Sequence, residues 1–473
     1  MSRIPLKCTI VLLVASAALA SCGGRGVSSG GGGSTGTAPV VLTMTDTPPT
    51  NVSLLSAEVT LTGAALGPGN VSLFSGATTI ELTRLQTDIA YISTTLVPSG
   101  SYTSLALTFS NPTLTIENDT GSSLVTGGSN PACISSAICT IQSVATNLST
   151  TITLSPAMTV SATSGAGLLA DVNLNNLLSA TLGADFKNGV TVSEFTPAST
   201  GAPPVGAEDV VGHVTTTDAT HSKFSLQNAV GMVSLTVDNT TTFLNFPTGT
   251  CTTPSIACLQ ANQILSVDIS IRADGTPVAR NVLFEDADST DIEVEGIITS
   301  TGSVTFKMVT LAESTAITGL RIGDVATVQY STTSPATQFE KDLVYADNVL
   351  VDTTGFVFSA PADLLVGQQV QVRRNPMSGT LITADRVRLR SSRVTGQALA
   401  GGATTLFNLG SLPSIFTTHV APQIQVITSS STICTGTVSN CSSLALNVQH
   451  SLSVRGPMFA SSKTLVASKV VQH

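Results

Sequence analysis

The sequence predicts an all-β protein: an N-terminal antiparallel β-sandwich followed by three small β-barrel-like repeat units. Short runs of alternating apolar and polar residues, separated by clusters of Gly, Pro, Asn and Asp, are typical of antiparallel strands and turns. Three landmarks recur in the same order along the second half, which indicates an internal repeat. Hydrophobic residues make up 42% of the 473 residues, enough for packed cores, and the length indicates three or four domains.

The first residues have the three parts of an export signal. Arg3 and Lys7 supply positive charge, and residues 9–19 are apolar or small but too short for a comfortable membrane span. Leu19-Ala20-Ser21-Cys22 then resembles the bacterial lipobox, whereas an ordinary secretory signal with a nearby cysteine is the alternative. We therefore expect residues 1–21 to be a lipoprotein signal peptide.

The lipobox resemblance implies a lipid anchor on Cys22. In such proteins the cysteine thiol carries diacylglycerol and the freed amine is acylated, and several acyl chains bind a membrane far better than one. Gly23 stands where an inner-membrane retention Asp would be, which favours the outer membrane. A Gly/Ser-rich tether follows at residues 22–39, with a root-mean-square reach of roughly 22 Å. The expected location is the cell envelope, and the expected partner is its membrane.

Residues 40–197 show the period-two pattern of the predicted sandwich. Ala57, Val59 and Leu61 alternate with polar residues, and a turn at Pro98-Ser99-Gly100 leads into another apolar run. The best helix candidate, residues 174–180, is short.

This region, about one third of the chain, resembles a bacterial lipoprotein domain, the domain of unknown function 4382. The clearest likeness is the run Pro98–Leu105, and the other matching runs are Leu42–Pro48, Ala57–Gly63, Ile80–Leu85 and Leu169–Leu174. Leu73-Phe74 stands where family members often carry a Trp. The resemblance implies the fold and the location, but no chemistry, because none is assigned to the family.

A Pro-rich stretch, residues 198–207, is expected to link the sandwich to the repeats. Each repeat begins with Val-x-Gly, continues with a strand that carries an inward Phe, and closes with Ala-x-x-Val. The landmarks are Gly212, Phe224 and Ala279–Val282; Gly296, Phe306 and Ala384–Val387; and Gly396, Phe407 and Ala467–Val470. We predict β repeat units at residues 208–286, 291–391 and 392–473, with each Gly at a bend or bulge of a barrel corner.

These units resemble a second family, the domain of unknown function 5666, which occurs in similar lipoproteins. The first unit keeps the family pattern best, and the middle unit carries an insertion around residues 331–352. This resemblance likewise assigns no activity.

The eight cysteines divide into three groups. Cys8 lies in the signal, and Cys22 is expected to take the lipid. The other six form three close pairs: Cys133 with Cys139, Cys251 with Cys258, and Cys434 with Cys441. In an exported protein such pairs predict local disulfides, each worth about 2.5 kcal/mol by the loop-entropy relation. Metal binding is the alternative, but it needs shorter Cys spacing or nearby His.

An acidic run joins the first two repeats: Glu285, Asp286, Asp288, Asp291, Glu293 and Glu295. Asp286, Asp288 and Asp291 could ligate calcium through carboxylate oxygens, although the loop Gly and terminal Glu of an EF-hand are missing. The alternative is a solvated linker. We expect no resident cofactor.

One basic cluster comprises Arg373, Arg374, Arg386, Arg388, Arg390 and Arg393. Arg386, Arg388 and Arg390 alternate, so they share one face of a strand. That face could meet anionic lipid or polysaccharide, or it is an ordinary outward strand face. Nucleic acid is not an expected partner, because the net charge is −9 and the predicted barrels lack interleaved stacking aromatics.

Local patterns do not assemble a catalytic site. His450 falls in the apolar register of Leu446 and Leu452, which predicts a buried, hydrogen-bonded histidine. No Ser or Cys nucleophile is paired locally with a His and a carboxylate, and the paired acids of a glycosidase would meet only in space.

We therefore predict a non-enzymatic, lipid-anchored envelope protein that presents β modules for structural or adhesive contact. A glycan- or envelope-polymer-binding module is the rival, weakened by the absence of Trp and the scarcity of Tyr, and a hydrolase is a weaker rival. A cleft lined by Phe, Tyr and polar side chains would favour glycan binding, whereas two facing acids would favour hydrolysis. Candidate partners besides the membrane are an envelope polysaccharide and another surface protein.

Overall fold

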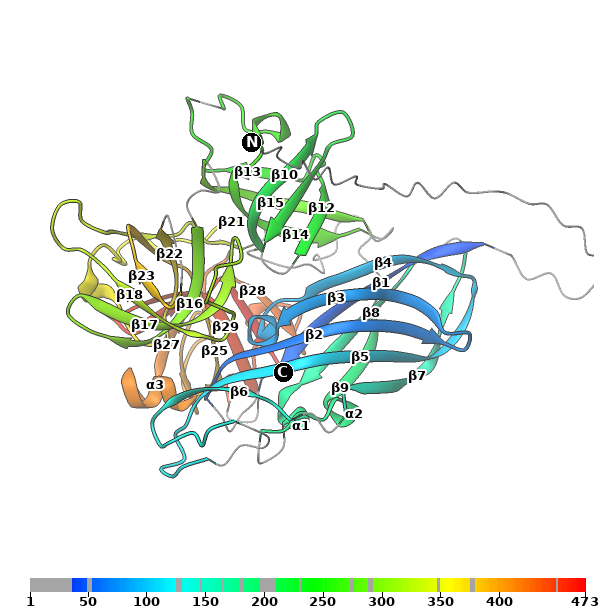
Figure 1. The fold of residues 1–473 in the computed structure, drawn as a ribbon, viewed down its shortest axis with the longest axis horizontal. Helices are drawn as coiled ribbons and strands as arrows, with labels where there is room; N and C mark the ends of the chain where they lie inside the picture. Colours follow the sequence, from blue (N-terminus) through cyan, green and yellow to red (C-terminus); the bar gives the residue numbers. More distant parts are fainter. Residues whose placement is uncertain are drawn as a thin grey trace, which may run out of the picture. The chain divides into compact units, whose positions relative to one another are not determined.

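The structure of the chain is a computed structural model, and most of it is β-strand (Figure 1). Strands make up 58% and helices 7%, which confirms the all-β prediction. The described residues lie within the compact unit Thr35–His473. They are residues 36–48, 53–124, 130–144, 147–162, 165–178, 182–195, 210–228, 231–249, 251–272, 276–287, 292–346, 349–374, 379–447 and 450–473. The predicted signal peptide, Cys22, most of the predicted tether and the linker 198–207 fall outside them.

The first sheet of the N-terminal region has the strand order β4-β1-β8-β9. Its strands are β1 (Thr37–Thr47), β4 (Ala90–Pro98), β8 (Ala166–Asn173) and β9 (Val190–Phe195). β1 pairs antiparallel with β4 but parallel with β8, so the sandwich is not antiparallel throughout as we predicted. The chain between β1 and β8 passes through the second sheet and returns in the same direction, as a parallel pair requires. β1 also begins at Thr37, inside the predicted tether.

The second sheet has the order β3-β2-β5-β6, and β7 also pairs with β5. Its strands are β2 (Ser53–Gly67), β3 (Val71–Glu81), β5 (Gly100–Glu117), β6 (Ile138–Gln142) and β7 (Ser149–Val160). The alternating residues Ala57, Val59 and Leu61 are buried, because every second side chain of a strand faces the same side. The short helices here are η1 (Leu82–Gln86), α1 (Leu174–Leu177) and α2 (Phe186–Gly189). α1 lies at the predicted helix candidate.

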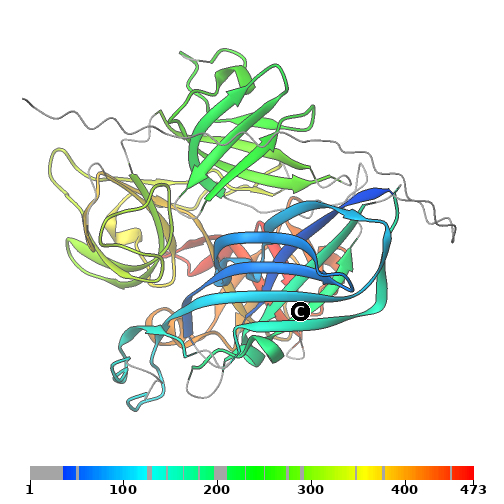
Figure 2. The ribbon, with the colours of Figure 1, turned by 45° about the vertical axis from the view of Figure 1, so that its right-hand side comes forward.

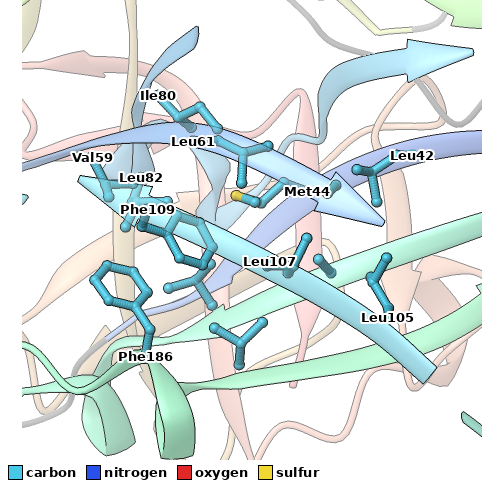
Figure 3. Close-up of a cluster of buried hydrophobic side chains, with 14 of the residues drawn as sticks. Leu42, Met44, Val59, Leu61, Ile80, Leu82, Leu105, Leu107, Phe109 and Phe186 are labelled. Atoms are coloured by element: carbon cyan, nitrogen blue, oxygen red, sulfur yellow. The ribbon is translucent and has the colours of Figure 1, made fainter. Parts of the chain in front are cut away.

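The sandwich core lies between these two sheets. Figure 3 shows Leu42 and Met44 of β1 near Leu61 of β2, all completely buried. Phe109 of β5 stacks on Phe186 of α2, with 4.2 Å between the ring centroids. Paired aromatic rings add about 0.5–1.5 kcal/mol beyond the area they bury, so α2 is held against the sheet by this contact.

Three further sheets follow, and we call them the first, middle and third barrels (green, yellow and orange-red in Figure 2). The first contains β10 (Val210–Asp218), β11 (Lys223–Asn228), β12 (Gly231–Thr236), β13 (Thr242–Leu244), β14 (Ile264–Ile271) and β15 (Pro277–Asp286). The middle contains β16 (Ile292–Thr301), β17 (Thr305–Glu313), β18 (Val325–Gln329), β19 (Gln338–Lys341), β22 (Gln369–Arg374), β23 (Leu381–Thr383) and β24 (Arg386–Leu389). The third contains β25 (Ser391–Ala398), β26 (Leu406–Gly410), β27 (Ile424–Ile427), β28 (Ile433–Gly436), β29 (Ser451–Phe459), β30 (Thr464–Val466) and β31 (Lys469–Gln472).

All three barrels share one connectivity. The opening strand pairs antiparallel with the second strand and with the fourth: β10 with β11 and β14, β16 with β17 and β22, and β25 with β26 and β29. The third strand pairs parallel with the fifth: β12 with β15, β18 with β23, and β27 with β30. The fifth strand continues as β24 in the middle barrel and as β31 in the third, and it pairs antiparallel with the fourth strand: β15 with β14, β24 with β22, and β30 and β31 with β29. The resulting order, 1-2-3-5-4, is that of the five-stranded OB-type barrel.

The repeat landmarks have the same role in each barrel. Phe224, Phe306 and Phe407 of the second strands are all buried, as predicted. A Cβ atom on the Val-x-Gly glycine would lie only 2.5–2.6 Å from a carbonyl oxygen of the second strand, which belongs to Gln227, Val309 or Gly410. Glycine is therefore required for this close approach of two backbones.

Each barrel also has a strand and a 3₁₀ turn between its third and fourth strands, which our sequence reasoning missed. The added strands β13, β19 and β28 pair parallel with β15, β24 and β31. The turns are η2 (Ile256–Cys258), η3 (Pro361–Asp363) and η4 (Cys441–Ser443). The middle barrel adds the hairpin β20 (Tyr345–Ala346) and β21 (Val349–Leu350), and the third adds α3 (Ser414–His419).

Candidate functional site

The acidic run and the basic cluster meet in the folded chain. Arg386 and Arg388 are 7% exposed and Arg390 is 1% exposed, so the predicted outward strand face is wrong. β24 is flanked by β22 and by β19, and carboxylates of the first barrel and of the insertion cover its arginine face. We call this set the ionic junction: Glu285, Asp286, Glu293, Glu340 and Asp342 with Arg373, Arg386, Arg388 and Arg390.

Arg390 is the most buried cation of the junction. Its Nη1 donates to Glu285 Oε1 at 3.0 Å, and Nη1 also pairs with Asp342. Its Nη2 donates to Ser266 Oγ at 3.2 Å. One guanidinium therefore connects β15 and β14 of the first barrel with the insertion of the middle barrel, and its five N–H donors suit such a role.

Arg386 and Arg388 pair with carboxylates on both sides of β24. Arg388 pairs with Glu285 and lies 2.7 Å from Glu340 Oε1, and Arg386 pairs with Glu293. Burial raises the pKa of Glu293 to about 7 against the opposing effect of Arg386. Burial, with Arg390 nearby, lowers the pKa of Arg388 to about 9. The junction therefore holds several charges in a site where solvent stabilises them poorly.

Asp286, the described member of the calcium candidate, is engaged by Arg373. Arg373 Nη1 donates to Asp286 Oδ2 at 2.8 Å, and Nε donates to Asp385 Oδ1 at 2.9 Å. Asp288 and Asp291 lie outside the described residues. Within the described ranges, no three His, Cys, Asp or Glu side chains gather closely enough to hold a metal ion.

Ion pairs also connect the sandwich to the barrels. Arg393 Nε of the third barrel donates to Asp88 Oδ2 at 3.2 Å, and Arg84 Nη1 donates to Glu295 Oε2 of the middle barrel at 3.2 Å. Burial acts to raise the pKa of Asp88, but nearby cations, Arg393 first among them, outweigh burial and hold the pKa below its usual value. The ionised form of Asp88 is thus stabilised at this contact.

Three disulfides join the expected cysteine pairs. Their Cα–Cα distances are 5.9 Å for Cys133–Cys139, 5.6 Å for Cys251–Cys258 and 5.0 Å for Cys434–Cys441. The latter two lie between the third and fourth strands of the first and third barrels. The middle barrel has its insertion at this position.

The histidines do not gather into a catalytic group. His450 is half-buried rather than buried, because β29 begins only at Ser451 and the period-two register does not extend back to it. His419 Nε2 lies 2.8 Å from Glu117 Oε1, and His221 Nδ1 lies 2.6 Å from Asp218 Oδ2 on an exposed loop. Among the described residues, no helix is both long enough and apolar enough to span a membrane.

An open groove of about 430 Å³ runs between β4 of the sandwich and the first barrel. We call it the barrel groove, and its lining includes Tyr91, Thr94, Lys223, Met232, Ser234 and Thr236. Sequence reasoning missed this site, because its two walls are more than one hundred residues apart. No carboxylate or histidine occurs among the described residues that line it.

Fold and contacts together define a class: an all-β protein of one sandwich and three OB-type barrels, with ion pairs between its modules. Comparisons with protein families, with curated proteins and with solved structures find no match to this chain in any of the three. The resemblances to the two domains of unknown function therefore stay predictions.

Proposed function

We propose that this chain is a non-enzymatic, lipid-anchored protein of the cell envelope that presents its β modules as one scaffold for structural or adhesive contact. The ionic junction carries the proposal. Five of its charged side chains are buried against one another and are not available to a ligand in solution: Glu285, Glu293, Arg386, Arg388 and Arg390. Relative motion of domains is the default at polar interfaces, but separating the modules at the junction would leave buried charges without their partners, which opposes such motion.

The envelope location is supported by the sequence and by the disulfides. The segment that ends at Cys22 has the order of a lipoprotein signal, and disulfides such as Cys133–Cys139 persist in oxidising compartments. The proposal places the anchor on Cys22 and, because Gly23 follows it, favours the outer membrane.

Replacement of the anchoring cysteine tests the location. Cys22→Ala is expected to abolish labelling by a radioactive fatty acid and to release the chain from the membrane fraction. Cys8→Ala is the matched control, because Cys8 lies in the predicted signal and should leave both readouts unchanged. Unchanged membrane retention of Cys22→Ala would contradict the anchor.

Deletion of the gene tests the scaffold role. Cells without the protein are expected to adhere less to a surface or to resist detergent less, and the wild-type chain should restore them. The Cys22→Ala chain should fail to do so at equal abundance. A deletion strain that matches the parent in both assays would refute the proposed role.

A further inference from the structure

We propose that the barrel groove binds a neutral polysaccharide strand of the cell envelope. This inference does not depend on the scaffold role, because it concerns a surface outside the ionic junction. Its volume of about 430 Å³ lies within the range of roughly 300–1,000 Å³ typical of ligand sites.

The sandwich wall of the groove is shaped by a β-bulge. Leu42 pairs with Ser93 and Thr43 pairs with Tyr91, which leaves Ile92 as an extra residue on β4. The Tyr91 hydroxyl donates to Thr94 Oγ1 at 3.0 Å, so the bulge brings the two side chains to one face. Bulges often re-aim side chains next to functional sites, and here Tyr91 and Thr94 both line the groove.

The barrel wall is the outward face of β12. Met232, Ser234 and Thr236 alternate along the strand and share this face, and Leu235 between them is buried in the barrel core. Thr276 and Pro277, at the connection between β14 and β15, complete the wall. In OB-type barrels the second and third strands, with this connection, form the surface that takes oligonucleotides or oligosaccharides.

The chemistry of the lining selects a sugar over a nucleic acid. Hydroxyls of Thr94, Ser234 and Thr236 match the hydroxyls of a neutral glycan, and Tyr91 is the one aromatic residue of the described lining. Lys223 is the one cation among the described lining residues, and the whole chain carries a net charge of −9. Nucleic acid needs several cations to neutralise its phosphates, so this groove is poorly suited to it.

The lining also argues against a protein partner. Met232 is 67% exposed, and Val233 and Pro277 also line the groove, but four hydroxyl side chains lie among them, Thr94, Ser234, Thr236 and Thr276. The lining therefore lacks the continuous apolar core that is typical of a protein interface. An extended, hydroxyl-rich strand therefore fits the groove better than a folded partner does.

Calorimetric titration of the full chain, purified from membranes in detergent, tests the proposal with dextran and chitohexaose as neutral probes. We expect saturable binding of at least one of them. Tyr91→Ala should weaken it about tenfold, because it removes the aromatic ring from the lining, and Ser234→Arg should weaken it about tenfold, because a long charged side chain replaces a hydroxyl there. Tyr91→Phe keeps the ring and should bind within about threefold of wild type.

Ser300→Arg is the control for Ser234→Arg, because Ser300 is also exposed, on β16, outside the groove lining. It should leave binding unchanged. The proposal is overturned if neither polymer binds saturably, if Ser234→Arg binds as well as Ser300→Arg does, or if oligothymidylate binds more tightly than both sugars.

Discussion

The disulfide-closed barrels and the middle barrel stabilise the same segment in different ways. Between their third and fourth strands, the first and third barrels carry Cys251–Cys258 and Cys434–Cys441. The middle barrel carries instead an insertion that places Glu340 and Asp342 against the arginines of β24. A covalent bridge acts within its own loop, whereas buried ion pairs act across several elements. The segment between the third and fourth strands is therefore closed by its own disulfide in the first and third barrels. In the middle barrel the same segment contacts β24 and its arginines.

The largest expected loss of stability is at Arg390. It tests whether the buried ion pairs act across several elements. Arg390→Ala removes the cation that Glu285 and Asp342 share and leaves Glu285 with Arg388 alone, and breaking a buried pair costs about 3–5 kcal/mol. Native-state hydrogen exchange should show this loss in both β15 and β24. Arg272→Ala is the control, because its pair with Asp238 is partly exposed and is worth at most about 1 kcal/mol. Equal losses of stability in the two variants would show that the buried ion pairs of the junction contribute no more than a partly exposed pair does.

A smaller effect is expected from the disulfide of the first barrel. Replacing Cys251 and Cys258 with Ser should cost about 2.5 kcal/mol by the loop-entropy relation, and the lost protection should be confined to the first barrel. Mass mapping of the mature wild-type chain should find the three local bridges and no free thiol among those six cysteines. Bridges between modules, or lost protection in the middle barrel, would show that the disulfides do not act locally.

The smallest expected effect is on the pH dependence of the stability of the middle barrel. Burial raises the pKa of Glu313 to about 7 from its ordinary 4.5. Between these values the folded chain holds the proton more tightly than the unfolded chain, so stability falls as pH rises through this window. Burial also raises the pKa of Glu293 to about 7, so Glu313→Gln should remove only the part of this dependence that Glu313 contributes. It should stabilise the middle barrel by about 1–2 kcal/mol at pH 8, the full shift being reduced by partial solvation.

Thermal melts between pH 4.5 and 8 measure this difference. Glu194→Gln, at an exposed carboxylate of β9, is the matched control and should follow the wild-type curve. A Glu313→Gln variant with the wild-type pH dependence would show that another group controls the middle barrel.

Local sequence patterns predict part of the ionic junction but not its partners. The alternation of Arg386, Arg388 and Arg390 correctly places them on one face, but it does not reveal what covers that face. Glu340 and Asp342 alternate with the same period, and this complementary spacing is the signal that could have identified their partners. Tyr91 and the first barrel offer no comparable signal, because nothing in either segment indicates the other.

The sequence by itself determined the all-β class, the inward Phe of each barrel, the cysteine pairs and the short helix at Leu174. These features depend on spacing within a few residues, where strand period and loop length leave few alternatives. Only the tertiary structure decided that β1 pairs parallel with β8, that the arginine face of β24 is buried, and that His450 lies before the strand register begins. Such outcomes depend on which distant segments pair, and they follow from packing and from the pairing of buried charge rather than from local pattern.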